Sequence, residues 1–108
     1  MNYKLKNMKI FRHGDLLIKE IKELPKNLKE QKNGVLALGE VTGHSHELEG
    51  GKYRVLVDDS NKKFLEIMTA TMLKHQEHKT ITIAPAKYEV IIEQEFDPFA
   101  EEIQKVKD

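Results

Sequence analysis

A chain of 108 residues is about the size of one domain, so residues 1–108 are expected to form a single core. It holds no cysteine, which excludes disulfides and thiolate metal ligands, and its apolar runs are too short for a membrane span or a signal segment. We therefore expect a cytoplasmic protein without a membrane partner.

The 18 basic and 18 acidic side chains cancel in number, but they are unevenly distributed. Residues 1–33 carry nine Lys/Arg against four Asp/Glu, a net of +5, and residues 34–108 carry nine against fourteen, a net of −5. Such a basic segment can bind an anionic partner, yet its lysines are not interleaved with a stacking platform of aromatic residues. Solvated surface charge is the simpler interpretation, and nucleic-acid binding is only weakly supported.

In the first third of the chain, two short strands are predicted on either side of a Gly14-Asp15 turn, within residues 10–21. Apolar residues from Leu17 to Leu28 also have helical spacing, so a helix stays open as an alternative. Pro25 would interrupt that helix, because proline lacks the amide hydrogen and clashes with the preceding turn. We therefore favour strands.

The middle of the chain continues with short apolar segments between turn residues. Residues 35–38 predict a buried strand after the Asn33-Gly34 turn, and residues 52–57 alternate as a half-buried strand does. Residues 64–73 have a mixed periodicity that is compatible with a strand or a short helix.

The last third holds the clearest strands, at residues 80–83 and 88–92. Beyond them, Asp97 is a good N-cap residue and Pro98 suits the first position of a helix. A short C-terminal helix is therefore expected from about residue 98.

Together these elements predict a mainly β fold, either a small barrel or two packed antiparallel sheets of about six to eight strands, with the C-terminal helix. Alternation within the strands selects the core candidates. These are Leu36, Leu38, Val55, Val57, Ile81, Ile83, Val90 and Ile92.

Four of the five histidines lie in two short stretches of sequence. His44 and His46, in GEVTGHSHE, would project from one face if residues 41–46 are extended. His75 and His78, in HQEH, precede a clear strand, so a turn could aim both rings at one point. We interpret the two pairs, about thirty residues apart, as parts of one shared site.

Ordinary strand connections can bring both histidine pairs to the same end of a small β fold. We then expect ring centres within about 8 Å of each other and at least three of the four rings lining one pocket. Unrelated surface histidines are the alternative. The remaining histidine, His13, is interpreted as a turn residue and not as a ligand.

Three segments, GEVTGHSH, HQEHKTITIAPAKYEV and EQEFDPF, resemble a family of small uncharacterised proteins of bacteria and their phages. That family carries Gly-Glu-x-Thr-Gly-His-x-His, a later His-x-Glu-His and a Tyr-x-Val strand. The resemblance covers most of the chain from Arg12 onward. It implies that the two histidine pairs form one feature, and it implies no activity.

A looser resemblance is to cupins, whose first motif places His-x-His a few residues after a glycine, as Gly39 and His44-Ser45-His46 do. The second cupin motif often contains Pro-x-Gly followed by a histidine. Here Pro85 is present, Lys87 replaces that glycine, and Glu89 stands where a ligand is expected. The chain is also short for a full cupin barrel.

The leading hypothesis is a divalent-metal site formed by His44, His46, His75 and His78, with Glu77 as a ligand or general base. Imidazole suits Zn, Ni, Fe and Cu ions, and Mn becomes plausible if carboxylates join. An ion with an open position would activate water, and the reaction would be hydrolysis of a phosphodiester or nucleotide, with Glu77 and His78 as catalytic residues.

Two other classes of function stay open. The first is metal-free acid/base cleavage of RNA by two imidazoles, with Lys74 or Lys79 stabilising the developing charge. The second is a non-catalytic module that binds an anionic nucleotide, a nucleic acid or a protein partner. Exposed sheet edges are also compatible with a homo-oligomer.

Overall fold

The computed structural model describes residues 8–38 and 43–93, and every regular element there is a β-strand. One sheet has six strands, in the spatial order β1 (Ile10–His13), β2 (Leu16–Ile21), β10 (Ala86–Ile92), β7 (Lys63–Ile67), β6 (Tyr53–Val57) and β3 (Lys29–Gln31). The second sheet has four, in the order β4 (Val35–Leu38), β5 (Ser45–Glu49), β8 (Thr71–Lys74) and β9 (Ile81–Ile83).

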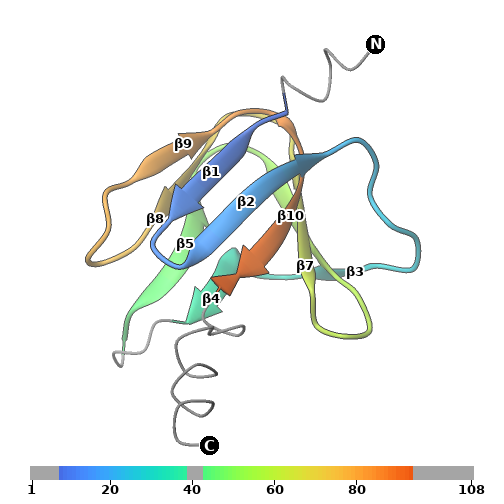
Figure 1. Cartoon of the computed structure of the whole chain (residues 1–108), viewed down its shortest axis with the longest axis horizontal. Helices are drawn as coiled ribbons and strands as arrows, with labels where there is room; N and C mark the ends of the chain where they lie inside the picture. The colour runs from blue at the N-terminus through green and yellow to red at the C-terminus, as the bar shows by residue number, and fades with distance from the viewer. Residues whose placement is uncertain (1–7, 39–42, 94–108) are drawn as a thin grey trace, which may run out of the picture.

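All neighbouring strands are antiparallel, and the two sheets pack against each other (Figure 1). Each sheet keeps two edge strands, β1 and β3 in one and β4 and β9 in the other, so neither closes into a barrel. The mainly β prediction is confirmed in its second form, two packed antiparallel sheets. The described residues contain ten strands, more than the six to eight expected.

Alternation along the strands places one row of apolar side chains between the sheets. In β2, Leu16 and Ile18 are fully buried, and they belong to the same core cluster as Leu48 of β5 and Leu73 of β8. Tyr88, the third residue of β10, is also fully buried. Because the core is shared, the two sheets form one unit.

Half of the predicted core residues are buried, namely Leu36, Val55, Ile83 and Val90, but the prediction of Leu38 as a core residue is wrong, since it is 76% exposed. The pairing of β4 with β5 shifts register between Val35 and Ala37, which is a bulge. A bulge inserts one extra residue and reverses the faces beyond it, so Leu36 points into the core and Leu38 points out. Ile81 and Ile92 are half-buried against the core, and Val57 is half-buried.

The remaining predictions of secondary structure can be compared strand by strand. The two strands around Gly14-Asp15 are confirmed as β1 and β2. The ambiguous segment 64–73 contains most of β7 and most of β8, with no helix. The predicted C-terminal helix lies outside the described residues. Within the described part of the chain, no helix is long and apolar enough to cross a membrane.

Candidate functional site

All five histidine rings lie together at the junction of the two sheets. The distances between ring centroids are 4.4 Å for His46 and His75, 4.5 Å for His75 and His78, and 5.6 Å for His44 and His75. The ring of His13 lies 5.0 Å from that of His46 and 5.7 Å from that of His78. We call these five residues the histidine cluster. The predicted convergence of the two pairs is confirmed.

Elements of both sheets hold the cluster in place. His13 is the last residue of β1 in the six-stranded sheet, and His46 is the second residue of β5 in the four-stranded sheet. Both residues are 2% exposed. His44 precedes β5, and His75 and His78 lie in the loop between β8 and β9. The cluster therefore exists only when the two sheets are packed together.

A chain of polar contacts runs through the two buried rings. The Nε2 atom of His13 lies 2.9 Å from the carbonyl oxygen of Lys79, and its Nδ1 atom lies 2.9 Å from Nδ1 of His46. The other ring nitrogen of His46, Nε2, lies 3.2 Å from Oδ1 of Asp15. Each buried ring thus has a polar partner at both of its nitrogens.

These three contacts need three protons, because neither a carbonyl nor a carboxylate oxygen can donate. Two neutral imidazoles carry only two protons. The proton of His13 goes to Nε2, which must donate to the Lys79 carbonyl, and a proton on Nε2 of His46 donates to Asp15. The Nδ1 lone pairs of His13 and His46 then face each other at 2.9 Å, where a cation is favoured.

Burial disfavours a proton as the cation between the two Nδ1 atoms, because it disfavours the charged form of either ring. Desolvation, reinforced by the charge that His75 and His13 would carry, lowers the pKa of His46 to about 4, against a smaller opposing effect of Asp15. Desolvation also lowers the pKa of His13, and the hydrogen bond to Lys79 opposes this only in part. At neutral pH both buried rings are therefore neutral.

The loop between β8 and β9 forms the rim of the cluster. The backbone N–H of Glu77 donates to Nδ1 of His75 at 3.0 Å, and the N–H of Ser45 donates to Oε1 of Gln76 at 2.9 Å. The exposed carboxylate of Glu77 lies 3.5 Å from Nδ1 of His44. These contacts attach the loop to β5 and orient His75.

The ring of His78, from the loop between β8 and β9, lies against the turn between β1 and β2. A Cβ atom added to Gly14 would come within 2.6 Å of Nε2 of His78, so a side chain there would force this exposed ring to shift. Gly14 also has φ of +64°, which favours glycine for a second reason. The turn therefore sets the position of a ring that comes from the other sheet.

No group of three or more histidine or carboxylate side chains in residues 8–38 and 43–93 is arranged to hold a metal ion as it stands. A pocket of about 450 Å³ adjoins the cluster over β5 and β8, and His75 is its only histidine. The expectation that three histidines line one pocket is therefore not met there.

The residues of the histidine cluster all lie within a segment that matches a protein-family model. Residues 12–93 match the model of the family described as Domain of unknown function (DUF8820). The chain belongs to this family. No curated protein and no solved structure matches the chain.

The matched part of this DUF8820 chain contains all five histidines and Asp15. Four of the histidines are predicted from their spacing, but the interpretation of His13 as a turn residue is wrong, because His13 is a buried member of β1 within the cluster. Asp15 was missed as well. The available signal was His13-Gly14-Asp15 at a predicted hairpin turn, where a glycine leaves room for a neighbour.

Two acidic residues singled out in the sequence of this DUF8820 chain have different positions. Glu77 lies at the rim of the cluster, beside His44. Glu89, the position suggested by the cupin resemblance, pairs with Lys62 on the six-stranded sheet at 2.8 Å and has no hydrogen bond to the cluster.

Proposed function

We propose that the histidine cluster binds one divalent transition-metal ion. The observation that carries this proposal is the pair of Nδ1 atoms of His13 and His46, which face each other at 2.9 Å while both Nε2 atoms have acceptors. A metal-bound imidazole typically donates its other N–H to a carbonyl or a carboxylate. The Lys79 carbonyl and the Asp15 carboxylate supply one acceptor of each kind.

A third ligand would come from the rim. His78 is the best candidate, because its ring lies 5.7 Å from that of His13 and is exposed enough to rotate. His75 would first have to release the hydrogen bond from the N–H of Glu77. Because no three ligands are already in place, binding requires such a side-chain rotation. Three imidazoles suit Zn²⁺, Ni²⁺, Fe²⁺ or Cu²⁺, and Mn²⁺ less well.

The proposed reaction is hydrolysis. An ion with three protein ligands keeps an open position and lowers the pKa of bound water. Glu77, exposed at the rim, is the candidate general base. The adjoining pocket contains Glu47 and Glu49 against Lys74, and Lys74 already pairs with Glu49 at 2.6 Å. This charge balance adds no support for a phosphodiester or a nucleotide as the substrate. We therefore propose hydrolysis without naming the class of bond that is cleaved.

Metal titration of protein purified without a histidine tag tests the proposal. After EDTA treatment and dialysis, we expect calorimetry with Zn²⁺, Ni²⁺ and Mn²⁺ to give about one equivalent bound and a raised melting temperature, with Mn²⁺ weakest. His13→Gln and His46→Gln should each reduce affinity at least about tenfold. Glu47→Gln, a neighbouring charge outside the cluster, is the matched control.

His78→Ala complements these buried variants, because an exposed residue is replaced without loss of folding. It should weaken metal binding and leave the stability of the metal-free protein nearly unchanged. Binding of less than about a tenth of an equivalent, without a thermal shift for any of the three ions, would rule out the metal site.

One observation favours metal-free acid/base catalysis as the second candidate. His75 and His78 have ring centroids 4.5 Å apart at the rim, and neither needs to move to act as an acid and a base. RNA cleavage would then persist in EDTA with a bell-shaped pH dependence. Complete loss of cleavage in EDTA would exclude this candidate.

A further inference from the structure

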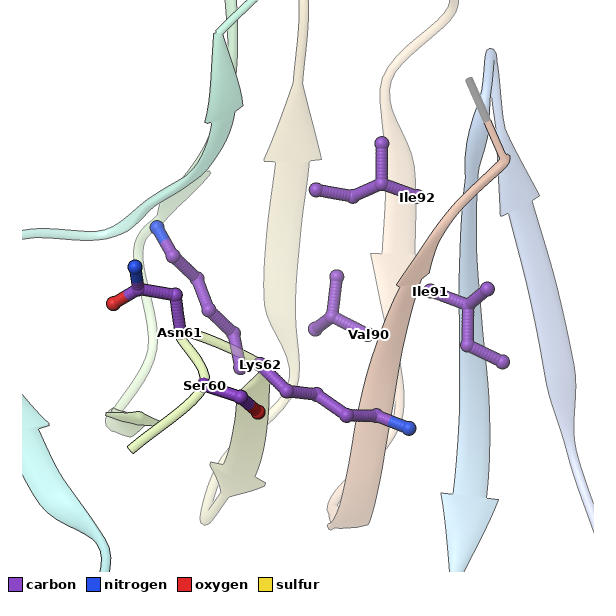
Figure 2. Close-up of a pocket in the computed structure, with 7 residues that line it drawn as sticks. Ser60, Asn61, Lys62, Val90, Ile91 and Ile92 are labelled. Atoms are coloured by element: carbon purple, nitrogen blue, oxygen red, sulfur yellow. The ribbon is translucent and has the colours of Figure 1, made fainter. Parts of the chain in front are cut away.

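A second pocket lies away from the histidine cluster, between the turn that joins β6 to β7 and the end of β10. It has a volume of about 310 Å³ and is lined by residues 60–63 and 90–92 (Figure 2). Volumes near 300 Å³ are at the small end of the range for ligand-binding pockets. The pocket is therefore large enough for a small organic molecule.

The pocket combines an apolar wall with a polar rim. Val90 and Ile92, from alternating positions of β10, point to the same side in Figure 2, and the turn residues lie beside them. The turn is fixed by Asp58, whose Oδ1 atom accepts hydrogen bonds from the backbone N–H groups of Ser60 and Lys62 at 2.8 and 2.9 Å. The rim is thus held in one conformation before any ligand arrives.

The two lysines of the rim have different surroundings. Lys62 is neutralised, since its Nζ atom lies 2.8 Å from Oε2 of Glu89. Nζ of Lys63 donates to the carbonyl oxygen of Val35 at 2.9 Å, and no described carboxylate lies within ion-pair distance of it. Burial lowers the pKa of Lys63. A half-buried ammonium without a counter-ion among the described residues is costly, and a bound anion would remove that cost.

We propose that this pocket binds a small organic acid, with its carboxylate on Nζ of Lys63 and its apolar body chiefly on the half-buried Ile92, beside the 4% of Val90 that is exposed. An ammonium still has two protons to donate after its bond to the Val35 carbonyl. The side-chain amide of Asn61 lies at the same rim and offers two further donors. The hydroxyl of Ser60 already donates to Asp58 at 2.8 Å and contributes no donor. The site is independent of the proposed metal.

Amide chemical shifts of the full-length chain provide the test. Phenylacetate should shift the amide resonances of residues 60–63 and 90–92 in a saturable manner. Phenylethanol has the same skeleton without the charge, and acetate has the charge without the apolar body, so both should bind at least about tenfold more weakly.

Variants of the rim residues distinguish binding at this pocket from a general attraction of anions to surface lysines. Lys63→Met should weaken phenylacetate binding about tenfold or more, whereas Lys62→Met, which removes an already paired charge, should change it less than about twofold. Asn61 has φ of +69°, so Asn61→Gly removes the amide without straining the turn and should weaken binding. Unchanged resonances elsewhere verify folding of each variant.

Three outcomes overturn the proposal. They are no saturable shift with phenylacetate up to about 10 mM, equal binding of phenylethanol or acetate, and equal effects of Lys63→Met and Lys62→Met. If Lys63→Met does not fold, Asn61→Gly and the three probes decide the result by themselves.

Discussion

His46 is buried between His13 and Asp15, and this burial disfavours its protonated form. Desolvation lowers the pKa of His46 to about 4, while an unfolded histidine titrates near 6.5. Above about pH 6.5 neither state is protonated and stability does not depend on this ring. Between about pH 6.5 and 4 the unfolded state binds the proton first, so stability falls as the pH falls.

We therefore expect the metal-free protein to lose about 2–3 kcal/mol of unfolding free energy between pH 7 and pH 4 through this ring. Urea denaturation in EDTA at several pH values measures the loss. In His46→Gln the slope over this window should be smaller. An equal slope in the variant and the native chain would contradict the assignment.

Gly14 controls the position of His78, and a second glycine provides a matched comparison. Gly14→Ala and Gly43→Ala both place a side chain at positive φ, +64° and +86°, at a backbone cost of about 1 kcal/mol. At Gly14 the new Cβ would meet a ring, 2.6 Å from Nε2 of His78, while at Gly43 no atom of the described residues lies within 4 Å. Calorimetric titration with Zn²⁺ should show weaker binding in Gly14→Ala, with Gly43→Ala close to the native chain.

At the scale of the strand, β10 holds the six-stranded sheet together, because it pairs with β2 on one side and β7 on the other. Tyr88 anchors this strand in the core. Its ring meets that of Phe11 edge to face at 5.9 Å, and its hydroxyl donates to the carbonyl of Ala84 at 2.5 Å. Desolvation, with a smaller effect of Glu20, raises the pKa of Tyr88 to about 12, so the hydroxyl stays protonated as a donor.

Tyr88→Phe keeps the ring and removes this hydrogen bond. We expect it to lower the unfolding free energy by about 1 kcal/mol, because the Ala84 carbonyl loses its partner in a partly buried place. Tyr53→Phe, on a half-buried tyrosine of β6, should change stability by less than about 0.5 kcal/mol. Urea denaturation at pH 7 compares the two, and equal losses would contradict the role given to the hydroxyl.

At the scale of the whole molecule, the shared core couples the two sheets. Leu65 of β7 and Leu73 of β8 are both fully buried, although they belong to different sheets. Leu65→Ala and Leu73→Ala should each cost about 3 kcal/mol and leave a single unfolding transition. Coincident curves from circular dichroism and tyrosine fluorescence would verify this, whereas two separated transitions would show that the sheets unfold independently.

Much of the fold follows from local sequence. Alternating apolar residues predict β6 and β10, because a strand turns successive side chains to opposite faces. The turn residues Gly14-Asp15 and Asn33-Gly34 mark where strands begin and end, because they adopt turn conformations easily. His44, His46, His75 and His78 stand out by their spacing, and the sequence alone indicated that they would meet.

Tertiary structure decided what local periodicity does not contain. A bulge in β4 turned Leu38 to solvent, since only the pairing with β5 sets the face of each residue. Two open sheets formed instead of a barrel, because long-range packing selects which strands pair. His13 and Asp15 lie beside His46 only because the end of β1 and the β1–β2 turn pack against β5 of the other sheet. No pattern along the chain encodes the distance between these residues and His46.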